Sequence, residues 1–205
     1  MSLAACDHPY DVILSGMKSP QWRKKMIHPL PEMPVVSREE ALIAFATGKR
    51  VLDIGSSGPM AVGLRMVANG VYGLDHTLPY DFKEYLQFMV TDLDDVSAKD
   101  LPHFAGVERI ICGEVIEHLS NPGWFLTRLR RQYPVPVIVT VPSAHNTRGV
   151  KWHLKGMECV NPDHIAWHSP ITIGNLLHRA GYSTHNWRWY NGRPNDAEGL
   201  IVEAH

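Results

Sequence analysis

Four acidic residues end or follow apolar stretches of the sequence. Asp53 and Asp75 end the stretches "RVLD" and "GVYGLD", and Asp92 ends "FMVTD". Glu114 follows Gly113 in "RIICGEV". Carboxylates accept hydrogen bonds from hydroxyl, amino and ammonium groups, and they repel phosphate. If the four stretches are neighbouring strands, their carboxylates meet at one edge and suit a ligand with a ribose, an exocyclic amine and an ammonium group.

A glycine-rich turn follows the first of these acids. Its sequence is "DIGSSGP", in which Gly55, Ser56 and Gly58 are the small residues. A dinucleotide-binding fold places G-x-G-x-x-G here, so that glycine backbone and a helix N-terminus hold a pyrophosphate. This turn lacks that spacing and has Asp53 two residues before its first glycine. We therefore expect a cationic or zwitterionic cofactor over the backbone of this turn.

Strand-length apolar runs alternate with segments of helical period, which is typical of a parallel sheet covered by helices on both faces. Helices are expected where a capping residue precedes an amphipathic run: after Ser37 in "SREE", after Asn121 and after Ser169. The expected strands are residues 50–55, 70–75, 88–92, 109–115 and 136–141, followed by the weaker 184–190 and 199–205.

The length of 205 residues suits one domain, which we expect to span residues 37–205. Residues 1–36 are rich in Pro and Met, and we expect them to form an N-terminal extension that packs on or near the substrate cleft. The stretch from about residue 142 to residue 168 is too long for an ordinary connection. Long loops in such folds carry function, so this one is expected on the substrate side.

Charge and cysteine content indicate the compartment. Lys and Arg (20) nearly balance Asp and Glu (21), so no overall field indicates a nucleic acid or membrane partner. The three cysteines, Cys6, Cys112 and Cys159, lack C-x-x-C spacing, which favours a reducing compartment. No signal-peptide core or apolar run of ~20 residues is present in the sequence. We expect a soluble cytoplasmic protein.

Taken in order, these motifs resemble those of the class I S-adenosylmethionine-dependent methyltransferases. The likeness extends from about residue 37 to residue 182, through "VLDIGSSGP", "VYGLD", "FMVTDLDD", "GEVIEHLSNPGWFL" and "DHIAWHSPITIGNLLHRAGY". The resemblance implies an α/β, doubly wound, mostly parallel seven-stranded sheet with helices on both faces and an antiparallel last strand. It also implies S-adenosylmethionine as the cofactor and methyl transfer as the reaction.

The resemblance assigns a part of the cofactor to each matched residue. Asp53 would shape the amino-acid end, and Asp75, with His76 beside it, would bind the ribose hydroxyls. Asp92 would accept from the adenine amino group next to the Leu93 backbone. The remaining cofactor-binding residues are Gly55, Ser56 and Gly58 under the cofactor, and Gly113 and Glu114 at the methionine ammonium.

A hydroxyl acceptor benefits from a base that removes its proton, and imidazole titrates in a suitable range. His118 and His164, the latter in the matched "DHIAWHS", are therefore the expected catalytic residues. Alternatively, Glu114, Glu117, His118 and His164 offer two carboxylates and two imidazoles to a divalent metal, Mg or Mn. That set resembles the metal site of the small-RNA 3′-end 2′-O-methyltransferases. We expect the base and no metal.

The expected acceptor is a hydroxyl of a small metabolite or sugar intermediate, because the sequence contains no evident nucleic-acid recognition segment. One alternative is a metal-dependent RNA ribose 2′-O-methyltransferase. A second is a non-catalytic cofactor-binding or scaffolding protein of the same fold.

Overall fold

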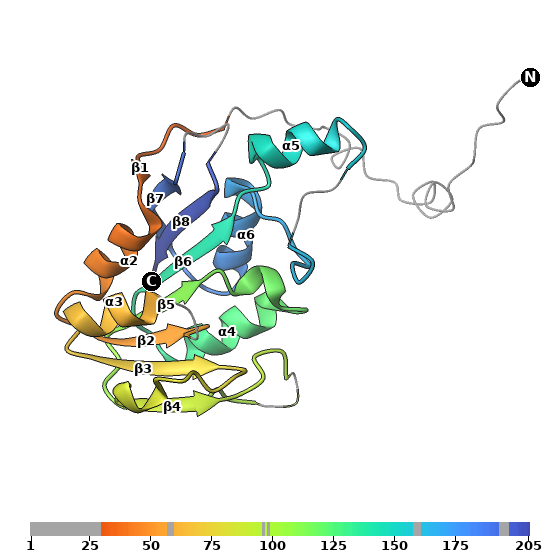
Figure 1. Cartoon of the computed structure of the whole chain (residues 1–205). Helices are drawn as coiled ribbons and strands as arrows, with labels where there is room; N and C mark the ends of the chain where they lie inside the picture. Colours follow the sequence, from red (N-terminus) through yellow and green to blue (C-terminus); the bar gives the residue numbers. More distant parts are fainter. Residues whose placement is uncertain (1–29, 57–59, 96, 98, 158–160, 193–196) are drawn as a thin grey trace, which may run out of the picture. The chain divides into compact units, whose positions relative to one another are not determined.

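An eight-stranded sheet runs through the chain in the order β1-β7-β8-β6-β5-β2-β3-β4 (Figure 1). The computed structural model describes residues 30–56, 60–95, 97, 99–157, 161–192 and 197–205. Neighbouring strands are parallel except β8, which is antiparallel to both β6 and β7. The strands are β1 (Val35–Val36), β2 (Arg50–Ile54), β3 (Gly70–Asp75), β4 (Gln87–Val90), β5 (Arg109–Gly113), β6 (Val137–Pro142), β7 (Thr184–Tyr190) and β8 (Gly199–Ala204).

The predicted doubly wound α/β fold is confirmed, with its antiparallel last strand. The sequence predicted seven strands, and the described chain has one more, β1, within the expected N-terminal extension. β1 comprises only two residues, Val35 and Val36, which pair with Trp189 and Tyr190 of β7. Two residues are too few for an alternating pattern, so this strand depends on a partner far away in the sequence. Most of the extension lies outside the described residues.

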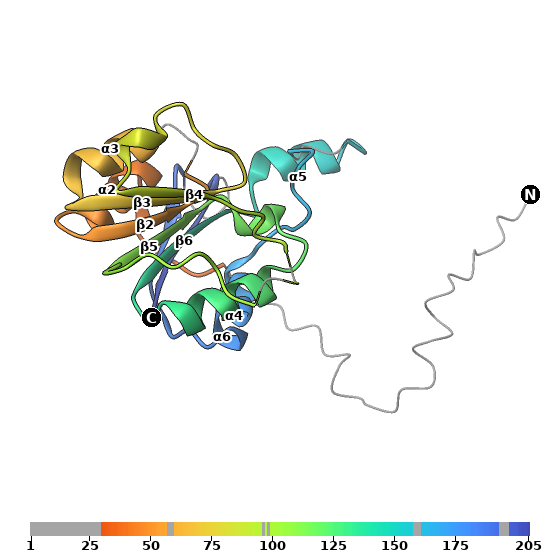
Figure 2. The same cartoon turned by 90° about the horizontal axis from the view of Figure 1, so that it is seen from below.

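Helices cover both faces of the sheet. α2 (Arg38–Ala46) and α3 (Met60–Val67) pack together on one face, and α4 (Pro122–Gln132) and α6 (Pro170–Arg179) pack together on the other (Figure 2). Two single 3-10 turns, η2 (Phe82–Glu84) and η3 (Ile116–His118), lie in the connections. The predicted substrate-side stretch 142–168 also contains α5 (Thr147–His153), which the sequence analysis did not expect.

Three of the described helices, α2, α4 and α6, begin at the capping residues that the sequence indicates. Ser37, Asn121 and Ser169 each accept a hydrogen bond from a backbone N–H of the first helical turn. Each such cap stabilises its helix by about 1 kcal/mol. No helix in the described part of the chain is long and apolar enough to cross a membrane.

The sheet register determines where the site forms. Asp53 of β2 pairs with Gly73 of β3 on one side and Ile111 of β5 on the other. Asp75 ends β3 opposite Val90 of β4. Because these strands are parallel and their apolar residues fill the core, their carboxyl ends come together at one edge, where ligands bind in folds of this kind.

Candidate functional site

Three cavities open at this edge, and Glu114 lines all of them. The first, about 220 Å³, is lined by Asp53, Gly55 and Gly113 among others. The second, about 490 Å³, is lined by Gly55, Asp75, His76, Leu93 and His118 among others. The third, about 610 Å³, is lined by Arg38, Glu114 and Tyr190 among others. Most of the described residues that the sequence assigned to one cofactor therefore line adjoining cavities, whereas Ser56 and Asp92 line none of the three.

The turn after β2 is shaped by Gly55. Its φ is 75°, and a Cβ there would lie 2.5 Å from the Val115 Cγ2 atom, so a side chain would be both strained and crowded. Its N–H donates to the Leu74 carbonyl at 2.9 Å, which holds the turn against β3. Ser56 is buried, and its Oγ has no hydrogen-bond partner among the described residues. The predicted Gly58 lies outside the described residues.

Asp53 is buried at the first cavity. Burial, followed by the negative charge of Asp75, raises its pKa to about 7, and Arg65 partly opposes both effects. Such a carboxyl group is only partly ionised near neutral pH. A cation bound in the first cavity would favour the ionised form, because opposite charges attract strongly where water is excluded.

Asp75 and Asp92 lie at the ends of β3 and β4. Asp75 is buried, and its carboxylate lies 2.9 Å from the Nδ1 atom of His76, whose side chain is exposed. Asp92 is exposed and accepts from the Asp94 N–H at 2.9 Å, while Leu93 is buried and lines the second cavity. The structure therefore places Leu93 inside the cavity and Asp92 beside it.

Glu114 is held by residues that the sequence analysis missed. Its Oε1 atom accepts from the hydroxyls of Thr140 and Tyr190, each at 3.0 Å, and lies 3.7 Å from the Arg38 guanidinium. Its φ is 56°, an unusual value for a residue with a side chain. Burial raises its pKa, and Arg38 is the strongest opposing influence. Arg38 carried no signal beyond its place in the capping motif, and Tyr190 lay in a weakly predicted strand.

A second cluster comprises Glu117, His118 and His164. These residues each offer one ligand atom, and the three atoms lie within 4.8 Å of one another. The two imidazole rings meet edge to face, with centroids 4.6 Å apart. His164 reaches the cluster because the Glu117 carbonyl accepts from the N–H groups of Ile165 and Ala166, which ties the substrate-side loop to η3.

The carboxylate of Glu117 has no hydrogen-bond partner from another residue in the described part of the chain. The residue is 0% exposed, and its own backbone N–H is the polar group that lowers its pKa from close by. Burial, followed by the charge of Glu114, raises its pKa to about 8. Burying a carboxylate without a partner costs several kcal/mol. This arrangement fits a cation between the carboxylate and the two imidazoles.

Both imidazoles have surroundings that suit a metal ligand. His118 Nδ1 lies 3.1 Å from the Asp163 carbonyl, which only accepts, so Nδ1 donates this hydrogen bond and Nε2 is the ring nitrogen left to bind a metal. Such a hydrogen bond to the second ring nitrogen is usual for histidines that bind metals. Burial and the neighbouring His118 lower the pKa of His164, which favours the neutral ring. Glu114, the fourth residue of the predicted metal set, is not in this cluster.

No protein-family model matches the sequence, and no curated protein matches it significantly. Solved structures do match the fold. The small RNA methyltransferase HEN1 has a TM-score of 0.63 at 18% identity, with 82% of this chain and 24% of HEN1 covered. The chain therefore spans about a quarter of that protein.

Two further matches cover most of both chains. Magnesium protoporphyrin IX methyltransferase from Synechocystis, with bound S-adenosylhomocysteine, has a TM-score of 0.57 at 16% identity, covering 81% of this chain and 80% of its own. A 1,6-didemethyltoxoflavin-N1-methyltransferase from Burkholderia thailandensis has a TM-score of 0.59 at 13% identity. The match covers 81% of this chain and 75% of that enzyme. The chain has the fold of the class I S-adenosylmethionine-dependent methyltransferases.

Proposed function

From this fold, we propose that the chain binds S-adenosylmethionine and transfers its methyl group to a hydroxyl oxygen, assisted by a divalent metal at Glu117, His118 and His164. The buried carboxylate of Glu117, beside two imidazoles and without a hydrogen-bond partner from another described residue, is the observation that carries the metal part of this proposal. The sequence analysis put a general base first. The cluster geometry supports the metal alternative better.

The two smaller cavities suit the two ends of S-adenosylmethionine. Asp53 and Gly113 line the first cavity, where the Asp53 carboxylate favours the cationic methionine end. Asp75 and Leu93 face the second, where Asp75 suits the ribose hydroxyls and the Leu93 backbone suits adenine. The cofactor already carries an activated methyl group, so the protein must align the acceptor and remove its proton.

A divalent ion held by Glu117, His118 and His164 would orient a hydroxyl and lower its pKa. Mixed carboxylate and imidazole ligands suit Mn, and Mg is the alternative. His118 lines the second cavity and belongs to the cluster, so it connects the two parts of the site, and Glu114 lines both cofactor cavities three residues before Glu117.

The terminal ribose of an RNA strand is the acceptor that we favour. Its two neighbouring hydroxyls offer a hard cation a pair of oxygen ligands. The likeness in fold to a small RNA methyltransferase supports this choice. The second candidate is the hydroxyl of a sugar-bearing small molecule, which the balanced net charge of −1 supports, since it indicates no extended basic surface.

Methyl transfer to matched oligonucleotides tests the proposal. The chain would be given labelled S-adenosylmethionine and a short RNA that ends in a ribose or in a 2′-deoxyribose, in EDTA and then with Mn added. We expect methylation only of the ribose end and only with Mn. Glu117→Gln should abolish turnover, while Glu40→Gln, a change at an exposed glutamate of α2, should have no effect.

Three results would contradict parts of the proposal. If turnover survives EDTA, the metal is not needed, and His118 or His164 as the general base becomes the better explanation. Methylation of a sugar-bearing small molecule but not of RNA selects the second candidate. A folded chain that binds cofactor without transferring methyl to any hydroxyl acceptor supports the non-catalytic alternative.

A further inference from the structure

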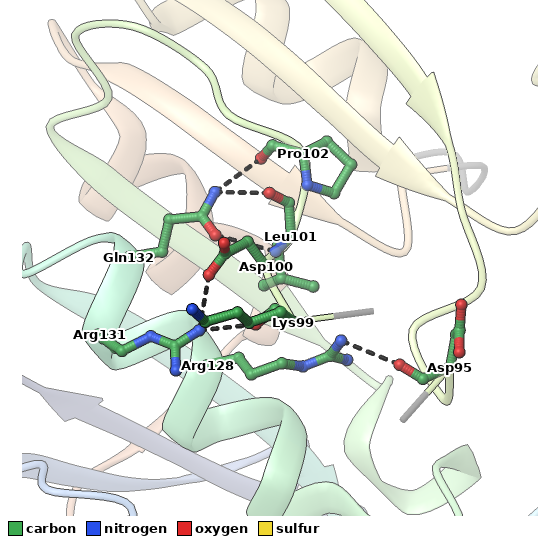
Figure 3. A network of polar contacts seen from close by, with 8 residues as sticks. All are labelled: Asp95, Lys99, Asp100, Leu101, Pro102, Arg128, Arg131 and Gln132. Atoms are coloured by element: carbon green, nitrogen blue, oxygen red, sulfur yellow. Dashed lines mark hydrogen bonds and ion pairs between the residues drawn. The ribbon is translucent and has the colours of Figure 1, made fainter. Parts of the chain in front are cut away.

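The turn beside the second cavity is fastened to α4 by a series of arginine and glutamine contacts. Figure 3 shows Arg128, Arg131 and Gln132 reaching from α4 to the segment that follows β4. Arg131 donates to the Lys99 carbonyl at 2.6 Å, and Gln132 donates to the Leu101 carbonyl at 2.7 Å. These contacts hold the end of the segment around Lys99 and Leu101, several residues after Asp92 and Leu93.

Arg128 holds the part next to the cavity. Its guanidinium donates to the Leu93 carbonyl at 2.8 Å and to the Asp95 carbonyl at 3.0 Å, so it contacts the backbone on both sides of Asp94. Its Cζ atom lies 5.6 Å from the centroid of the Trp124 ring, one helical turn earlier, which supports its orientation. A planar guanidinium with several fixed donors can hold two carbonyls at once, which an ammonium group does poorly.

The burial of Arg128 shows that this contact is costly to make. The residue is 1% exposed, and taking a guanidinium out of water is unfavourable unless its donors are well used. Asp94 adds a second fastening, because both of its carboxylate oxygens accept from the Ser120 N–H at 2.9 Å. The peptide groups of Leu93 and Asp95 are thereby fixed in orientation.

We infer that Arg128 is a positioning residue for adenine recognition, acting through the Leu93 and Asp95 carbonyls on the turn that bears Asp92 and Leu93. This inference rests on the proposed binding of S-adenosylmethionine. Asp92 would accept from the adenine amino group, and its position depends on the turn because the Asp94 N–H donates to its carboxylate. Arg128 itself does not touch the cofactor.

Discrimination between two ligands tests this role. S-adenosylhomocysteine carries the adenine amino group, and S-inosylhomocysteine carries a carbonyl oxygen there, which a carboxylate repels. Calorimetry gives the Kd of each for the wild type, Arg128→Met and Arg131→Met. Arg131 is the matched control, because it lies on the same helix and contacts the same segment farther from Asp92.

We expect the wild type and Arg131→Met to prefer S-adenosylhomocysteine to the same degree. Arg128→Met should raise the Kd of S-adenosylhomocysteine by about tenfold and that of S-inosylhomocysteine much less, so that the preference largely disappears. The preference of Arg128→Lys should lie between those of the wild type and Arg128→Met, because one ammonium group holds two carbonyls less well than a guanidinium does. If Arg128→Met does not fold, Arg128→Lys decides the test.

A merely structural role predicts a different pattern. The inference is wrong if a folded Arg128 variant keeps the wild-type preference, whether both affinities are unchanged or both fall together. The inference is also wrong if the wild type binds both ligands equally. That result would leave the proposed binding of S-adenosylmethionine intact. If the wild type binds neither S-adenosylmethionine nor S-adenosylhomocysteine, the proposed function fails and the inference fails with it.

Discussion

The buried Asp53 should make cofactor affinity depend on pH. Its pKa of about 7 arises from burial, then from Asp75, with Arg65 opposing both. Tyr85 and Cys112 also interact electrostatically with Asp53. A cationic cofactor prefers the ionised carboxylate, and well below pH 7 the ionised fraction falls about tenfold for each pH unit. The Kd of S-adenosylmethionine should therefore rise about tenfold from about pH 6 to about pH 5.

The ionised carboxylate of Asp53 should lower the free energy of unfolding. The native pKa lies above the usual 3.8, so the stability that protonated Asp53 provides is present at low pH and is lost as the pH rises towards about 7. The difference between 3.8 and about 7 corresponds to about 4 kcal/mol at about 1.4 kcal/mol per pKa unit. Asp53→Asn should therefore raise the melting temperature at about pH 8 and weaken cofactor binding.

Calorimetry and thermal unfolding of the wild type and Asp53→Asn test both effects. Glu40→Gln is the control, because Glu40 is exposed on α2 and lines none of the three cavities. The wild type should show the steep loss of affinity below neutral pH, and Asp53→Asn should show little pH dependence in the same range. If both proteins lose affinity equally between about pH 6 and about pH 5, another group binds the proton and the assignment to Asp53 is refuted.

Two further predictions concern the neighbouring residues. Asp75→Ala should weaken cofactor binding by about 1.5 to 3 kcal/mol, the range for hydrogen bonds to a charged group, and unchanged affinity in calorimetry would remove the ribose assignment. Gly55→Ala should lower the free energy of unfolding by about 1 to 2 kcal/mol because of its positive φ, with a further loss from the clash with Val115. In denaturant unfolding, adding Val115→Ala should recover only the loss in free energy of unfolding that the clash causes. Recovery of the whole loss would show that the backbone at Gly55 is unstrained.

The sequence predicted those features that depend on local pattern. The apolar runs predicted the seven main strands, and Ser37, Asn121 and Ser169 marked helix starts, because periodicity and capping are read within a few residues. The positions of Asp53 and Asp75 at one edge followed from the parallel order of their strands. The functional roles assigned to these residues stay predictions.

Other features depend on contacts between distant segments, which the local residue pattern does not indicate; the grouping of His164 with Glu117 was expected only as the metal alternative. β1 exists because Val35 and Val36 find β7, which begins almost 150 residues later in the chain. His164 joins Glu117 through backbone hydrogen bonds from a loop whose path no periodicity indicates. The burial of the Glu117 carboxylate, which changes the balance between base and metal, appears only once η3 is packed.

Direct measurement of Mn binding tests the central claim without knowledge of the acceptor. Free Mn²⁺ can be followed by electron paramagnetic resonance while the chain, saturated with S-adenosylhomocysteine, is titrated, for the wild type and for Glu117→Gln. The account predicts one site in the wild type and a loss of affinity of at least about tenfold in Glu117→Gln, which removes a metal ligand. Absence of binding in the wild type, or equal binding by both proteins, would contradict a metal at Glu117, His118 and His164.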